Sequence, residues 1–237
     1  MIETATRTRR STKRRDPTER IREIERRLSD AYGPAERERY DPLDELVLTI
    51  LSQNTNDGNR DVAYARLRDR FATWDDVRTA PRRQVESAIR TAGLWKQKAR
   101  AVQEFLKALH DERGCLSLAH LDAMGDDEAV AYLTGFRGVG VKTAACVLCF
   151  SLDRPVMPVD THVHRCAVRL GLIPREAGAG RAHEVLNEIV PPAVRFSLHL
   201  QLIRHGRRVC AARRPRCSEC IVADLCPRVG VPKEARR

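Results

Sequence analysis

The chain has 237 residues, of which 42% are hydrophobic and 32% charged, and its formal net charge is +11. This length is enough to bury a core without disulfide bonds. No apolar run reaches the roughly 18 residues of a membrane span, and no apolar segment follows the basic N-terminus, so we expect a soluble protein without a secretion signal. Apolar residues recur at helical spacing and strands are hard to place, so we predict an all-α fold.

The positive charge is concentrated at the two ends of the chain. Residues 1–15 carry +5 and residues 204–237 carry +7, which leaves the body of the chain near −1. A charge excess of this kind can simply aid solubility. However, basic ends on a near-neutral body are more typical of a protein that binds a polyanion, and nucleic acid is the first candidate.

Residues 1–17 lack apolar periodicity and end at a proline, so we predict a disordered basic arm. A mitochondrial targeting peptide is the competing interpretation, and Glu3 and the missing apolar face weaken it. After the arm, Gly, Pro and Asp signals separate about ten predicted helices, with Gly93 and Gly114 at C-terminal caps. These helices span residues 18–31, 42–52, 57–71, 81–92, 96–113, 126–134, 141–152, 161–171, 181–190 and 193–209.

The segment LTGFRGVGVKTAA, residues 133–145, predicts a helix end, a tight turn and a new helix. Its turn contains Gly135, Gly138 and Gly140, and glycine allows positive φ and close approach of another backbone. The new helix directs free N–H groups and the positive end of its dipole outward. Such a hairpin can bind phosphate without reading bases, although a plain helix connection is the alternative.

Two residues are candidates for catalysis, one directly after the hairpin turn and one further along the chain. Lys142 falls in the first turn of the new helix, where the dipole and burial both favour a neutral, nucleophilic amine over an ammonium. Asp160 follows in the segment PVDTHVHR, just before a helix predicted from Thr161. Asp160 could act as a helix N-cap without any catalytic role.

Four of the eight cysteines form a second candidate site. Cys210, Cys217, Cys220 and Cys226 crowd into seventeen positions rich in Arg and Pro. Four thiolates this close can hold zinc or a [4Fe–4S] cluster, and spacing alone leaves both open. Cys146 and Cys149 form a CxxC motif, but they share one face of an apolar helix, so we expect them to be buried packing residues.

The span FRGVGVKTAACVLCFSLDRPVMPVDTHVHRCAVRLG resembles the hairpin and aspartate segment of the endonuclease III family. The family's lysine matches Lys142 and its aspartate matches Asp160. The resemblance covers roughly residues 18–228. It implies a helix-hairpin-helix DNA glycosylase and abasic-site lyase of base excision repair, in which Lys142 attacks C1′ of a flipped nucleotide and Asp160 assists.

The C-terminal segment also resembles this family. HGRRVC followed by the remaining cysteines matches the family's cluster loop, which implies a [4Fe–4S] cofactor. The loop carries a group of arginines, and in the family such side chains lie against the DNA backbone. The resemblance therefore implies phosphate contacts by Arg207, Arg213 and Arg214.

Two further matches concern extraction of a base from the stack. AGLWKQKA resembles the family's wedge loop and places Leu94 at the inserted leucine. LSQNTND resembles the segment with the plugging amide, but the family's glutamine aligns with Asn54, and Gln53 takes the place of a small residue. This departure leaves the opposite-base preference open. Without the resemblance, Leu94 could be a buried leucine and the two amides a polar helix end.

By the resemblance we expect two lobes with the DNA groove between them. Residues 44–155 would form a six-helix barrel domain with the hairpin, and residues 18–43 together with 156–237 the iron–sulfur cluster domain. We expect a monomeric enzyme that acts on damaged, chiefly oxidised, pyrimidines in double-stranded DNA, without membrane contact, in the cytoplasm of a prokaryote. A mismatch-specific thymine or uracil glycosylase is one alternative. A non-catalytic DNA-binding module with a metal is another, and it would require neither Lys142 nor Asp160.

Overall fold

The computed structural model describes residues 16–236, so nearly all of the predicted basic arm lies outside the described residues. The described part of the chain consists of helices, short helical turns and connections, without a β-strand. The all-α prediction is confirmed. None of the described helices is both long enough and apolar enough to cross a bilayer.

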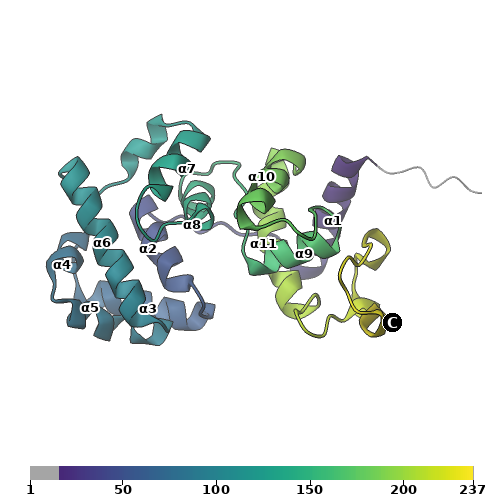
Figure 1. The fold of residues 1–237 in the computed structure, drawn as a ribbon, viewed down its shortest axis with the longest axis horizontal. Coiled ribbons are helices and arrows are strands. Elements are labelled where there is room, and N and C mark those ends of the chain that lie inside the picture. The colour runs from purple at the N-terminus through teal and green to yellow at the C-terminus, as the bar shows by residue number, and fades with distance from the viewer. Residues whose placement is uncertain (1–15, 237) are drawn as a thin grey trace, which may run out of the picture.

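Eleven α-helices make up the described architecture (Figure 1). In chain order they are α1 (Pro17–Tyr32), α2 (Pro42–Ser52), α3 (Asp57–Arg70), α4 (Trp74–Thr79), α5 (Arg82–Ala88), α6 (Trp95–Arg113), α7 (Asp126–Thr134), α8 (Val141–Cys146), α9 (Thr161–Arg169), α10 (Ala179–Ile189) and α11 (Arg195–Arg208). Short turns supplement them, namely η1 (Arg90–Ala92), η2 (Ala119–Ala123), η3 (Val147–Ser151), η4 (Pro192–Val194), η5 (Cys217–Glu219), η6 (Ala223–Leu225) and η7 (Lys233–Arg236).

Two separate hydrophobic cores divide these helices into two lobes. The first core is built from residues 43–148, and we call this part the inner lobe. The second core joins residues 21–28 of α1 to residues 157–222, and we call this part the terminal lobe. Figure 1 shows the lobes side by side, with α1 packed among α9, α11 and the C-terminal segment. The two ends of the described chain therefore share one core.

Local sequence signals explain where several helices begin and end. Asp16 and Asp41 cap α1 and α2 by accepting hydrogen bonds from backbone N–H groups, and a proline follows each cap at the first helical position. Gly93 and Gly114 end η1 and α6 with positive φ values of 65° and 68°, as predicted from sequence.

Three predicted helices differ in kind from the observed ones. The helix expected over residues 193–209 is the 3-10 turn η4 followed by α11. The helix expected over residues 81–92 breaks at Ile89 into α5 and η1. The helix expected over residues 141–152 is α8 continued by the π-helix η3, in which the hydrogen bonds span one more residue than in an α-helix. Helix α4 was not predicted, although Thr73 and Asp76 form a reciprocal capping box at its start.

Candidate active site and cysteine loop

A cleft of about 1550 Å³ lies between the lobes and is lined by residues of both. Helices α2, α3 and α8 contribute from the inner lobe, and α9 and α11 from the terminal lobe. The cleft brings together five of the residues singled out by sequence, namely Gln53, Asn54, Lys142, Asp160 and Arg207. Its size is sufficient for a drug-sized ligand or an extruded base.

Lys142 stands in the first turn of α8, one residue after the exposed Val141. Lys142 is near enough to Glu45, Cys146, His183 and His199 for its charge to influence the pKa of each. Cys146 is one helical turn further along α8 and is buried, as predicted, but it also lines the cleft. The amine therefore lies on the cleft wall in partly buried surroundings.

Asp160 enters the cleft from the terminal lobe at the start of α9. One carboxylate oxygen accepts a hydrogen bond from the Val163 N–H at 2.7 Å, so the residue is a helix N-cap. Two buried histidines hold the preceding segment. His199 Nδ1 donates to the Pro158 carbonyl at 2.8 Å, and the Val159 N–H donates to His183 at 3.3 Å. Capping therefore occupies one of the two carboxylate oxygens.

Burial lowers the pKa of His183 and of His199 to about 4. Both imidazoles are therefore neutral near pH 7 and act as fixed hydrogen-bonding groups beside Lys142 and Asp160. Sequence reasoning did not single them out. Their only signal was a polar side chain at an otherwise apolar helix position.

Glu45 is a further cleft residue that sequence reasoning missed. It lies on α2, is only 6% exposed, and accepts a hydrogen bond from the Thr49 hydroxyl at 2.9 Å. Burial raises the pKa of Glu45 to about 7. Glu45 and Thr49 are one turn apart in the apolar run LDELVLTILS, and this pair was the available signal.

The two loops expected to enter the DNA are tied to one buried lysine. Lys98 is 3% exposed, and its Nζ donates to the carbonyls of Leu51 and Ala92, each at 2.7 Å. Leu51 is the first residue of the segment LSQNTND, and Ala92 is the first residue of the wedge segment AGLWKQKA. Lys98 therefore satisfies a carbonyl at the C-terminal end of α2 and one at the end of η1, and so links the two ends.

The tips of both loops have unusual backbone conformations. Asn54 and Leu94 adopt positive φ values of 51° and 46°, and a branched residue such as leucine rarely does so. Leu94 is 47% exposed, so it is not the ordinary buried leucine that was the alternative. Gln53 lies beside Asn54 on the cleft, whereas Leu94 lies outside its lining.

The glycine hairpin joins α7 to α8. Only Gly138 has positive φ, at 88°, while Gly135 is helical and Gly140 is extended. Positive φ is therefore needed at one of the three glycines of the predicted turn. A side chain on Gly140 would meet nothing within 4 Å, which leaves its backbone open to a ligand at the start of α8.

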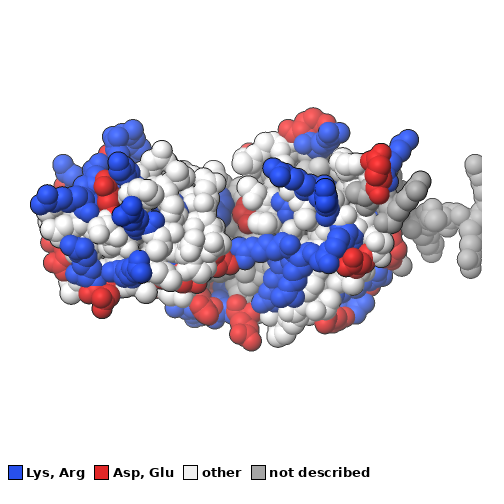
Figure 2. Space-filling view, turned by 90° about the horizontal axis from the view of Figure 1, so that it is seen from below, with Lys and Arg blue, Asp and Glu red and all other residues white. Residues whose placement is uncertain are grey.

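Arg207 reaches across the cleft to the inner lobe, although its side chain is about half exposed. Its guanidinium forms a bidentate ion pair with Asp57 of α3, at 2.6 and 3.1 Å, which joins the lobes and lowers the pKa of Asp57. Arg213 and Arg214 are exposed in the following loop. Figure 2 shows Lys and Arg side chains as a band over the terminal lobe, extending outward from its junction with the inner lobe.

The four clustered cysteines line one cavity in the terminal lobe. We call residues 210–226 the cysteine loop. Among the described residues, no three His, Cys, Asp or Glu side chains gather tightly enough to hold a single metal ion. A [4Fe–4S] cubane needs a wider spacing, because each of its four thiolates binds a different iron. Cysteines placed around a shared cavity fit that group.

Buried basic side chains position the first of these cysteines. Arg169 is 8% exposed and donates to the backbone carbonyls of Cys210, Ala211 and Ala212 and to the Cys210 sulfur. The Cys166 thiol, followed by Arg169, lowers the pKa of Cys210 to about 6, which favours the thiolate that binds iron.

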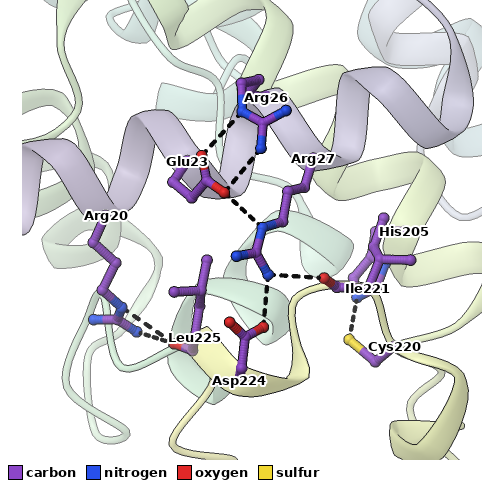
Figure 3. A network of polar contacts seen from close by, with 9 residues as sticks. All are labelled: Arg20, Glu23, Arg26, Arg27, His205, Cys220, Ile221, Asp224 and Leu225. Atoms are coloured by element: carbon purple, nitrogen blue, oxygen red, sulfur yellow. Dashed lines mark hydrogen bonds and ion pairs between the residues drawn. The ribbon is translucent and has the colours of Figure 1, made fainter.

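Helix α1 holds the other end of the cysteine loop (Figure 3). Arg20 donates to the Leu225 carbonyl at 2.9 and 3.1 Å, and Arg27 pairs with Asp224 at 2.7 Å. His205 of α11 lies 3.6 Å from the Cys220 sulfur. The cavity of the four cysteines is therefore fixed by α1, α9 and α11 together.

Two family models match the chain. The first, HhH-GPD superfamily base excision DNA repair protein, matches residues 47–192, which include the hairpin, Lys142 and Asp160. The second, the iron–sulfur binding domain of endonuclease III, matches residues 210–226, from the first to the last of the four cysteines. The two matches include both sites described above.

Individual proteins show the same likeness. A candidate DNA glycosylase of Arabidopsis thaliana is 38% identical over 200 residues, covering 82% of this chain and 68% of that protein. Endonuclease III of Escherichia coli K12 is 31% identical over 185 residues, covering 78% and 83%. A solved structure of a trapped endonuclease III–DNA covalent intermediate superimposes with a TM-score of 0.77 at 27% identity, covering 89% of this chain and 96% of that one.

Proposed function

The chain belongs to the endonuclease III family of HhH-GPD base excision DNA repair proteins, and we propose that it is a bifunctional DNA glycosylase and abasic-site lyase for oxidised pyrimidines. As a family member it is an endonuclease III-like repair glycosylase with the family's [4Fe–4S] binding motif. One observation carries the finer proposal: an amine and a carboxylate from different lobes, Lys142 and Asp160, line the same cleft.

Lys142 is the proposed nucleophile. Its neutral amine attacks C1′ of the extruded nucleotide, the C1′–N bond to the base breaks, and the amine loses a proton. Opening of the sugar ring then gives a Schiff base between Lys142 and C1′. Loss of a C2′ proton and of the 3′ phosphate cleaves the strand by β-elimination. A protein that only bound phosphate would not need this amine.

Asp160 is the proposed partner of this reaction. Its carboxylate stabilises positive charge that develops on the sugar as the base leaves, and it helps Lys142 lose its proton. The helix cap and the buried histidines fix the carboxylate before substrate arrives. Such fixed charge costs no reorganisation in the transition state.

The remaining sites would bind the DNA. The open backbone at Gly140 and the exposed Arg213 and Arg214 supply phosphate contacts without base specificity, while Leu94 and Asn54 fill the space left by the extruded base. Cys210, Cys217, Cys220 and Cys226 would hold the cluster. When bound, the cluster crosslinks the cysteine loop at four points and so supports this basic surface.

Two variants test the catalytic roles. Lys142→Gln should abolish both borohydride trapping and strand cleavage while lesion binding persists, because only a Schiff base is reducible to a stable link. Asp160→Asn should slow base release by several orders of magnitude yet still allow trapping on pre-formed abasic DNA. An adduct formed by Lys142→Gln would show that another amine is the nucleophile.

A lesion panel tests the substrate class. Duplexes with thymine glycol, dihydrouracil, uracil, mismatched thymine or an abasic site should be compared in single turnover. We expect the fastest base release from the two oxidised or reduced pyrimidines. Preference for mismatched thymine or uracil would replace this proposal with the mismatch glycosylase.

A further inference from the structure

Glu45 is a carboxyl at a buried position of α2, among apolar side chains. The neighbouring buried positions are Leu43, Leu46 and Val47. The Thr49 hydroxyl is its one hydrogen-bond partner among the described residues. A carboxyl in this environment is costly to ionise, and proteins retain such a group mainly where its protonation is used.

The surroundings of Glu45 connect it to the reacting centre. Helix α8 presents Lys142 and Cys146 to it, the π-helix η3 presents Cys149, and α3 presents Arg60. The charges of Lys142 and Arg60 lower the pKa of Glu45, but neither side chain forms an ion pair with it within the described residues. Glu45 and Lys142 both line the same cleft.

We propose that Glu45 is a second catalytic residue, a general acid that carries the proton lost by Lys142 to the departing base. This inference rests on the proposed glycosylase function. Because burial raises its pKa to about 7, Glu45 is about half protonated at neutral pH and largely protonated below it, so it can donate. Asp160, at the cleft wall of the other lobe, keeps its two proposed tasks, which are to assist loss of the proton from Lys142 before attack and to stabilise positive charge on the sugar. Glu45 acts on the departing base and takes up the proton of the ammonium formed after attack.

The proton balance requires such a group. When the Lys142 amine bonds to C1′, the C1′–N bond to the base breaks and its electrons leave with the base as an anion. The Glu45 carboxyl gives this anion a proton and becomes a carboxylate. The new secondary ammonium on Lys142 then returns a proton to Glu45, so the protons of the base-release step balance; water is needed only later, to hydrolyse the Schiff base and free Lys142.

The test compares two bases that differ in how strongly their departure depends on protonation. 5-Hydroxymethyluracil and 5-formyluracil, two oxidised thymines placed opposite adenine in the same duplex, differ in that the electron-withdrawing formyl group makes the departing anion less basic. Base release in single turnover should fall about 100-fold or more for Glu45→Gln on 5-hydroxymethyluracil, and clearly less on 5-formyluracil. Borohydride trapping on abasic DNA, where no base departs, should stay within about twofold of wild type.

The pH profile provides an independent readout. The rate of base release by wild type should decline as pH rises through about 7, and we call this decline the alkaline limb of the pH profile. The rate of Glu45→Gln should not show this limb. Thr49→Val keeps the carboxyl but removes the hydrogen bond that lowers its pKa, so it should move the limb to higher pH. A shifted limb also shows that the effect is not loss of folding.

The outcomes separate the two proposals. If wild-type protein releases no base from any duplex, the proposed function fails and this inference fails with it. If wild type is active but Glu45→Gln slows both bases and abasic trapping equally, Glu45 only supports the fold and the general-acid role is overturned. An unchanged pH limb in both variants would overturn it as well.

Discussion

Replacing Glu45 with glutamine should stabilise the protein at pH 8 and have little effect on its stability at pH 5. The folded-state pKa of this carboxyl is about 7, against 4.5 for an unperturbed glutamate. The folded state therefore binds the proton more tightly than the unfolded chain. The favourable contribution is fully present below about pH 4.5 and is lost as pH rises through 7.

The size of this effect follows from the shift. A difference of about 2.5 pKa units corresponds to about 3 kcal/mol of stability lost by wild type above pH 7. Because Glu45 is only 6% exposed, solvent screening reduces this figure little. Glutamine keeps the shape and the contact with Thr49 but carries no charge. For a chain of this length, about 3 kcal/mol raises Tm by roughly 6–12 °C.

The assay is thermal unfolding of wild type and Glu45→Gln at one scan rate, in steps from pH 5 to pH 8.5. Glu188→Gln, at an exposed position of α10, is the matched control and should show no pH-dependent difference. A Tm difference that is constant across the pH range would refute the reasoning. So would a variant that is less stable than wild type at pH 8.

Three further predictions concern the supports of the two sites. Arg169→Met should lower the iron content and the visible absorbance of purified protein, because three loop carbonyls lose their donor, whereas the exposed Arg181→Met should retain both. Lys98→Met should cost at least about 2 kcal/mol by leaving two buried carbonyls unpaired, measured by urea unfolding. Asp57→Asn should release Arg207 from its ion pair and allow it to bind a DNA phosphate. The slope of log affinity against log salt concentration should then become steeper by about one. An unchanged slope would show that Arg207 does not contact DNA.

Strong local signals made much of the fold predictable. The helix over Pro42–Ser52 was predicted with its observed bounds, because Asp41 and Pro42 start it and its apolar positions are dense. The break at Ile89 and the π-helix η3 depend instead on how the chain packs against neighbouring helices, and an apolar run does not record that.

The candidate site was partly predictable for a similar reason. Lys142 and the four cysteines stand out by residue type and spacing, whereas Glu45 is one glutamate in a helix that could have faced solvent. Only the tertiary structure shows that its side chain faces inward. The same holds for Arg207, which sequence predicted on phosphate and the structure places on Asp57.

The pairing of α1 with the cysteine loop has a consequence for synthesis of the protein. The inner lobe is continuous in sequence, so it can fold as soon as α8 and η3 have left the ribosome. Helix α1 emerges before the inner lobe but must wait, because the helices and the loop that pack on it are translated after that lobe. The cluster can bind only after the cysteine loop has been translated, and a chain truncated before this loop would leave α1 partly uncovered.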